Sequence, residues 1–200
     1  VVIATLLGKL GLPYSTFVAV LGTAGAAIAL ALRDSLTNFV GGVQILFTKP
    51  FYKGDFIENL EVAGIVEEIN MLYTTLKTYD NRVITLPNGK LANGTVINHT
   101  REPRRRIDMI LSVQNGEDIE QIRDILEAIA EAEPRILEDP PLFFGVAGQQ
   151  DGFLTLDFQV WCETTEFWDI KYRLTELIDS AFREAGIRIA APYLDVQLRK

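Results

Sequence analysis

The chain has 200 residues, a formal net charge of −8 and 48% hydrophobic residues, so it holds enough apolar material for a folded core and is not a disordered chain. One cysteine, Cys162, and one histidine, His99, exclude an internal disulfide framework and a Cys/His zinc cluster. The acidic total argues against a general nucleic-acid-binding protein. Because the first residue is Val1 and not methionine, we expect the numbering to begin inside a longer protein.

Charges are scarce near the N-terminus. The run from Leu10 to Leu32 has 23 residues and no charge, whereas a helix needs about 20 apolar residues to cross a bilayer. Residues 1–10 are predicted to be the end of a preceding transmembrane helix and a loop, in a multi-pass protein. A signal peptide is a less favoured alternative, because its apolar region of about 7–15 residues is shorter than this run. A buried helix of a soluble protein remains an alternative, because periodicity alone does not separate it from a spanning helix.

Small residues fill the second half of this run, and they separate into faces when placed at about 100° per residue. One face carries Thr16, Ala19, Thr23, Ala26, Leu30 and Arg33; one flank carries Gly22, Gly25 and Ala29, and the other Ala24, Ala27 and Ala31. Small flanks let helices pack closely in lipid, and polar residues are better placed toward water or protein than toward hydrocarbon. We interpret the pattern as a ring of identical helices around a water-filled axis, with Leu30 as a hydrophobic constriction. A GxxxG-like dimer or an ordinary bundle helix fits the same small-residue spacing.

The apolar pattern is interrupted at Arg33-Asp34-Ser35. Asp34 or Ser35 is predicted to cap a new, amphipathic helix at the membrane interface, which ends at Pro50. Residues 11–50 are thus predicted to form a pore-lining transmembrane helix and an interfacial helix. Arg33, Lys49 and Lys53 favour a cytoplasmic location for the C-terminal side.

The remaining chain carries most of the charge and is predicted to form two soluble modules and a tail. Residues 51–102 contain short β-branched runs at 62–69, 72–78, 83–86 and 96–97, with turn signals at 79–82 and 87–89, which indicate a small β-sheet. Residues 103–190 are predicted to alternate as strand 108–113, helix 117–133, strands 142–147 and 153–162, helix 165–185 and strand 187–189. This βαββαβ order is that of a ferredoxin-like α+β domain. Residues 191–200 hold a last strand that must find an edge to pair with.

Six motifs follow one another along nearly the whole chain: the stretch Val20–Val43, Lys49-Pro50-Phe51, Lys53-Gly54-Asp55, Val62–Val66, Pro87-Asn88-Gly89 and Asn98–Pro103. In this order they resemble the small-conductance mechanosensitive (MscS-type) ion channel family. The resemblance implies a homo-heptamer in the cell inner membrane, with its C-terminal domain in the cytoplasm, in contact with membrane lipids. It implies an ion channel that membrane tension opens to release ions and small solutes during hypo-osmotic shock. It also implies an Sm-like β domain and a C-terminal strand that forms an oligomeric β-barrel.

The sequence departs from the family pattern at two places in the pore helix. The family has two leucine rings in the pore, and the corresponding residues here are Ala26 and Leu30, so one ring is missing. The family's helix-kink glycine corresponds to Asp34, whereas the later glycine is kept as Gly42. A ring of Arg33 and Asp34 at the cytoplasmic mouth is expected to bias ion selectivity.

Catalysis and cofactors find little support. His99 stands alone in a loop-like stretch, Cys162 is expected to be a small buried hydrophobic residue, and no nucleophile–base pair, phosphate loop or metal motif occurs, so the chain is not expected to be an enzyme. Arg104-Arg105-Arg106 is either a solvated linker or an anion-attracting patch beside a side opening of the cytoplasmic chamber. The main alternative function is a membrane-anchored, ligand-binding sensor or scaffold without conduction. A soluble RNA-binding oligomer is a further alternative, against which the acidic balance counts.

Overall fold

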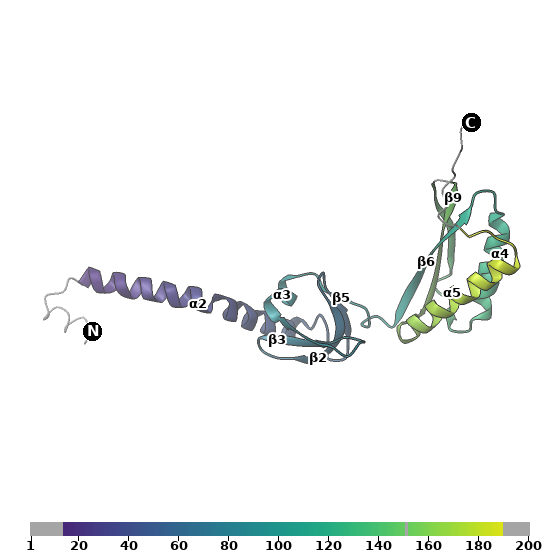
Figure 1. Ribbon diagram of the computed structural model, residues 1–200. Helices are drawn as coiled ribbons and strands as arrows, with labels where there is room; N and C mark the ends of the chain where they lie inside the picture. Colours follow the sequence, from purple (N-terminus) through teal and green to yellow (C-terminus); the bar gives the residue numbers. More distant parts are fainter. Residues whose placement is uncertain (1–13, 151, 190–200) are drawn as a thin grey trace, which may run out of the picture. The chain divides into compact units, whose positions relative to one another are not determined.

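The computed structural model describes residues 14–150 and 152–189, and these residues form two compact units with the boundary between Arg101 and Glu102 (Figure 1). The first unit has a five-stranded sheet and the second a four-stranded sheet. Each sheet has its own cluster of buried apolar side chains. The predicted end of a preceding helix at 1–10 and the predicted terminal strand at 191–200 lie outside the described residues.

Helix α2 begins the described chain and runs without a break from Tyr14 to Thr48. The predicted break at Arg33-Asp34-Ser35 is therefore wrong, and neither Asp34 nor Ser35 caps a helix, since both lie inside one. The physical reason is that no glycine or proline occurs between Ala26 and Val40, so nothing interrupts the backbone hydrogen-bond ladder. The helix ends at Thr48, shortly before Pro50 as predicted, and the next residue, Lys49, has a left-handed φ of 47°.

The first unit places α2 beside an open antiparallel sheet with strand order β4-β3-β2-β1-β5. The strands are β1 (Phe56–Glu58), β2 (Ala63–Ile69), β3 (Tyr73–Lys77), β4 (Val83–Pro87) and β5 (Ile97–Asn98). Four of them, β2 to β5, agree with the predicted runs to within one residue at each end, whereas β1 was not predicted. A short helix, α3 (Asn88–Asn93), stands where only a turn was expected. The core includes Ile45 from α2 together with Phe51, Ile57, Val66 and Leu76, so the end of α2 shares the core of the sheet.

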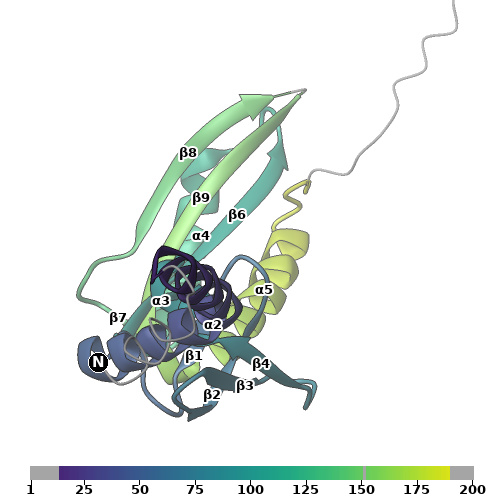
Figure 2. The ribbon, with the colours of Figure 1, turned by 90° about the vertical axis from the view of Figure 1, so that its left-hand side faces the viewer.

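The second unit is a four-stranded antiparallel sheet with two helices on one face (Figures 1 and 2). Its elements are β6 (Arg104–Gln114), α4 (Ile119–Ala132), β7 (Ile136–Leu137), β8 (Phe143–Gln150), β9 (Phe153–Glu163), a 3₁₀ turn (Thr164–Glu166) and α5 (Phe167–Glu184). Strand β9 is central and pairs with β6, β7 and β8. The strand predicted at 187–189 is described only as a single bridge between Val113 and Ile189.

Local sequence explains the ends of the two helices. The Asp118 side chain accepts hydrogen bonds from the backbone N–H groups of Glu120 and Gln121, which caps α4. After α5, Gly186 has a φ of +73° and Ile187 donates its N–H to the carbonyl of Phe182, a glycine-based helix end. Between these ends, the apolar stripes of α4 and α5 pack against the sheet.

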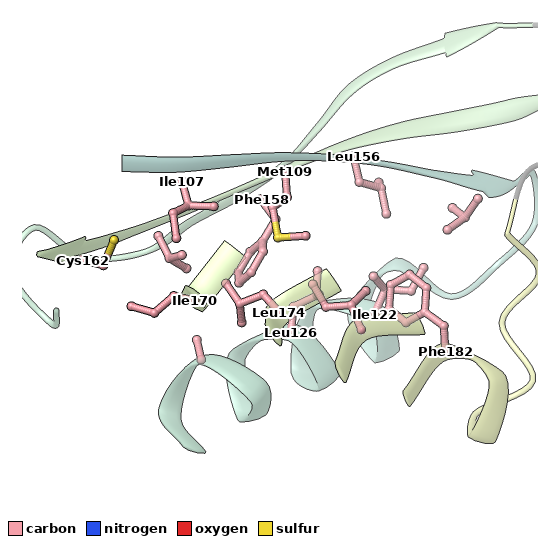
Figure 3. Close-up of a cluster of buried hydrophobic side chains, with 14 of the residues drawn as sticks. Ile107, Met109, Ile122, Leu126, Leu156, Phe158, Cys162, Ile170, Leu174 and Phe182 are labelled. Carbon is pink, nitrogen blue, oxygen red and sulfur yellow. The ribbon is translucent and has the colours of Figure 1, made fainter. Parts of the chain in front are cut away.

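The core of this unit lies between the sheet and its helices (Figure 3). Ile107, Leu156 and Phe158 point from the strands toward Leu126 and Leu174 of the helices, and all five are fully buried. The alternation along β9 leaves its other face uncovered by α4 and α5. The second unit is therefore a two-layer α+β fold.

Candidate functional site: the exposed helix and its anchor

Residues 15–37 of α2 are exposed on every side of the helix, except for Phe17, which is half-buried. The helix is apolar and long enough to cross a bilayer, and none of its 18-residue apolar window is buried inside the chain. Its 35 residues rise about 52 Å at about 1.5 Å each, against a hydrocarbon core of about 30 Å. The exposure argues against a core helix of a soluble protein, because such a helix would bury this window.

The predicted pore-lining residues Thr23, Ala26, Leu30 and Arg33 are all exposed and share one face of this continuous helix. Leu30 is 72% exposed, the most exposed of the large apolar side chains between Val18 and Phe39. Thr23 donates its hydroxyl hydrogen within the helix, where the carbonyls of Ala19 and Val20 lie 3.1 and 2.9 Å away. Its polarity is thus satisfied locally, and it does not by itself require water on this face.

The predicted packing residues lie bare on the two flanks. A Cβ atom added to Gly22 or Gly25 would meet nothing within 4 Å. The alanines on both flanks are exposed as well: Ala24, Ala27, Ala29 and Ala31. No contact within the described chain requires small residues at these positions. Both flanks are therefore free to pack closely against another helix.

Within the first unit, the C-terminal end of α2 packs closely against the sheet and the start of α3 through two adjacent glycines. A Cβ atom on Gly41 would lie 2.7 Å from the backbone carbonyl of Asn88. A Cβ atom on Gly42 would collide with the carbonyl oxygen of Met71 and lie 2.6 Å from the Asn88 side-chain nitrogen. Gly42 was predicted as a kink or cap residue. It lies inside α2 and therefore does not cap it, and it is the point of closest approach between α2 and the sheet.

Asn88 is the polar centre of this anchor, and its side chain is fully buried. Its Oδ1 accepts a hydrogen bond from the Thr74 hydroxyl at 2.7 Å, and its Nδ2 donates to the carbonyl of Asn70 at 2.7 Å. Next to it, the backbone N–H of Gly89 donates to Oδ1 of Asn38 on α2 at 3.1 Å. Sequence reasoning missed this role, although the motif Pro87-Asn88-Gly89 marked the position as a turn.

The three arginines of the basic cluster each have a different partner. Arg104 donates to the carbonyl of Asp139 at 3.1 Å, and Arg105 lies over the ring of Phe167, 3.7 Å from its centroid. Arg106 donates to Asp108 at 2.6 Å, and this hydrogen bond raises the pKa of the Arg106 guanidinium. Each of these contacts lies inside the second unit.

A partly buried ion-pair network connects the end of α4 to α5 and to the 3₁₀ turn that precedes α5. Glu133 is 4% exposed and binds Nε of Arg135 at 2.8 Å and Nε of Arg173 at 2.7 Å. The hydrogen bond from Arg135 lowers the pKa of the Glu133 carboxyl below its ordinary value. Arg135 also pairs with Glu166 at 3.1 Å. The network joins elements of the second unit.

Residues that sequence analysis weighed for catalysis have structural surroundings. His99 pairs with Glu58 through its Nε2 atom at 2.7 Å, and its ring lies against Phe56. Cys162 is fully buried in β9, and burial raises the pKa of its thiol, as expected for an unreactive core residue. Within residues 14–150 and 152–189, no three His, Cys, Asp or Glu side chains gather as metal ligands.

Comparison with known proteins matches both units. Residues 34–101 match the family described as mechanosensitive ion channel, beta-domain, and residues 107–189 match the mechanosensitive ion channel MscS, C-terminal family. The chain belongs to the MscS family of mechanosensitive ion channels.

Individual relatives agree with this assignment. An uncharacterized MscS family protein of Buchnera aphidicola is 33% identical over 97% of this chain and 69% of its own length. A small-conductance mechanosensitive channel of Helicobacter pylori is 32% identical over 96% of this chain and 71% of its own length. The crystal structure of Helicobacter pylori MscS in its closed state superposes with a TM-score of 0.89 and 31% identity, covering 98% of this chain and 78% of that chain. The fold is thus MscS-like, with a candidate membrane helix followed by β-containing domains.

Proposed function

We propose that this MscS-family chain is the pore-forming subunit of a homo-heptameric channel, which membrane tension opens to release ions and small solutes during hypo-osmotic shock. The single observation that carries the proposal is the bare small-residue surface of α2, for which the chain's own fold provides no contact. Family membership supports the same reading. The proposed partners are membrane lipids, the permeating ions and solutes, and other copies of the chain.

In the proposed ring, the flank of Gly22, Gly25 and Ala29 packs against the flank of Ala24, Ala27 and Ala31 of the neighbouring copy. Close packing of this kind is the main source of helix association in lipid, because apolar burial offers little there. The face between the flanks, with Thr23, Ala26, Leu30 and Arg33, then lines the axis. Small side chains at Thr23 and Ala26 leave Leu30 as the narrowest apolar ring, which closes the pore by excluding water.

Tension favours whichever state occupies more area in the membrane plane. Separation of the packed α2 helices increases that area and moves Leu30 away from the axis, so that water and ions enter. The end of α2 shares its core with the β sheet through Gly41, Gly42 and Ile45, which supports movement of this end together with the first unit.

The finer architecture also belongs to this proposal. The open five-stranded sheet is proposed to be Sm-like, and the antiparallel order of β6, β8 and β9 with two helices on one face supports a ferredoxin-like domain. The strand at 191–200 is proposed to join its copies in a barrel. The protein is proposed to be a multi-pass protein of the cell inner membrane, with residues 51–200 in the cytoplasm.

The proposal is tested by recording from the full-length protein in excised patches under graded suction. Leu30→Ser is expected to lower the activation tension or to produce a leak, because a hydroxyl removes the apolar seal. Leu32→Ser is the matched control, since Leu32 lies on the back of the helix, away from the proposed axis. Equal thresholds for Leu30→Ser and wild type would contradict the seal. Absence of any tension-dependent current from the wild-type protein would favour a membrane-anchored sensor without conduction.

A further inference from the structure

Two adjacent charges lie in the exposed part of α2. Arg33 and Asp34 are the only charged residues between Tyr14 and Thr48. In the described part of the chain, neither side chain forms a hydrogen bond or an ion pair, and the one side-chain hydrogen bond that reaches their backbone is donated by Thr37 to the carbonyl of Arg33. A charged pair without partners at the end of a membrane-spanning segment is costly, so a partner outside the single chain is expected.

The two charges do not neutralise each other within one helix. Successive residues project about 100° apart, so neighbours in sequence do not face each other. When the residues of α2 are projected down the helix axis, Arg33 lies at the edge of the face that carries Thr23 and Leu30, next to the flank of Gly22 and Ala29. Asp34 lies on the opposite edge, next to the flank of Ala27 and Ala31.

A cyclic ring of helices brings these two edges together. In such a ring one flank of each helix always meets the other flank of its neighbour. The Arg33 edge of one copy therefore meets the Asp34 edge of the next, with a difference in height of about 1.5 Å. We propose that Arg33 forms an ion pair with Asp34 of the adjacent copy, repeated around the cytoplasmic mouth of the pore; this inference rests on the proposed function.

The surface beside Arg33 fits this occupant. Arg33 borders an open groove of about 380 Å³ that is also lined by Ala29, Val40 and Gln44, and no acidic residue lines it. The groove follows the Arg33 edge of α2 from Ala29 to Gln44, and this edge borders the flank of Gly22 and Ala29 that would meet the neighbouring copy. A lipid phosphate could neutralise Arg33 there, but it would leave the Asp34 carboxylate without a partner. A second copy of the chain satisfies both charges at once.

The pair is expected to hold the closed arrangement, because opening separates the flanks on which the two charges stand. It also makes the mouth nearly neutral, with equal numbers of opposite charges. Neutralising one partner leaves a ring of the other, so the ion preference is expected to shift toward cations in Arg33→Ala and toward anions in Asp34→Ala.

The test is a double-mutant cycle on activation tension, measured with the full-length protein in liposomes with and without anionic lipid. Arg33→Ala and Asp34→Ala are each expected to lower the threshold, the double variant to lower it no further, and the exchange Arg33→Asp with Asp34→Arg to recover most of it. Additive shifts and no recovery in the exchange variant would overturn the ion pair. So would an Arg33→Ala shift that disappears without anionic lipid while Asp34→Ala has no effect, since that result assigns Arg33 to a headgroup.

A conservative variant guards against simple failure of assembly. Arg33→Lys with Asp34→Glu keeps both charges and is expected to gate close to the wild-type tension; a threshold like that of the double alanine variant would count against the pair. The test also separates this inference from the proposed function. If the wild-type protein shows no tension-gated current, the pore proposal fails; if it gates normally and the exchange variant does not recover, only the ion pair fails.

Discussion

Replacement of Gly42 by alanine tests the anchor between α2 and the β sheet. The added Cβ would collide with the carbonyl oxygen of Met71 and lie 2.6 Å from Nδ2 of Asn88, whereas carbon atoms in good contact are about 3.5–4.0 Å from their neighbours. One obstacle is backbone, and the other is a side chain held by two buried hydrogen bonds. Neither can rotate away, so the helix and the sheet must separate.

The expected cost follows from two opposing effects. Overpacking of a tight core costs about 1–3 kcal/mol, and the rigid obstacles place Gly42→Ala at the upper end. Alanine in a helix interior is about 1 kcal/mol more favourable than glycine. The net loss in the free energy of unfolding is therefore about 2 kcal/mol, which corresponds to about a 30-fold change in an opening equilibrium.

Hydrogen exchange of the full-length protein measures this change locally. Amides of β2 and β3, which flank Met71, are expected to lose protection by about 30-fold in Gly42→Ala. Gly148→Ala is the control, because its Cβ meets nothing within 4 Å and Gly148 lies outside the flanks of α2 that are proposed to pack together. Unchanged protection of β2 and β3 in Gly42→Ala would refute the close approach as a constraint on the fold.

Three further predictions concern the flank, the ion-pair network and the buried thiol. Ala27→Leu should reduce the oligomeric fraction on a native gel without changing the circular dichroism of the subunit, because Ala27 is exposed in the single chain. Glu133→Gln should lower the free energy of unfolding by about 1.5–3 kcal/mol at neutral pH, as hydrogen bonds to a charged group are lost. Since the pKa of Glu133 is lowered on folding, its contribution is present above the ordinary carboxyl value of 4.5 and disappears as the pH falls through the folded value, so the difference between wild type and variant in thermal melts should shrink in acid. Cys162 should react with maleimide only after unfolding; rapid labelling of the native protein would contradict its burial.

The main elements of the fold could be predicted because their patterns are local. The apolar run that became α2, the alternating runs that became β2, β3 and β4, and the amphipathic stripes of α4 and α5 each express a period that one segment carries by itself. Short elements escaped prediction: β1, β7 and α3 have too few residues for a period to show. They form because the neighbouring strands and α2 give their backbone groups partners.

The residues of the candidate site, like the elements of the fold, could be predicted where a local pattern marks them and were missed elsewhere. The flanks and the face of α2 were readable from the helical period, since a continuous helix places residues three and four apart together. The break predicted at Asp34 and Ser35 was wrong because polar side chains permit a helix end without requiring one. The helix continues to Thr48, where its last turns lie against the first unit.

An apolar helix with small residues on its flanks, followed by two charged modules, could be read from composition and periodicity, because these are properties of each segment alone. The roles of Gly41, Gly42 and Asn88 became visible only in the folded chain. Their function is a close approach between segments about 46 residues apart, and the collision that excludes a side chain at Gly42 exists only when Met71 and Asn88 have been brought beside it. A pattern within one segment does not encode such a distance between segments.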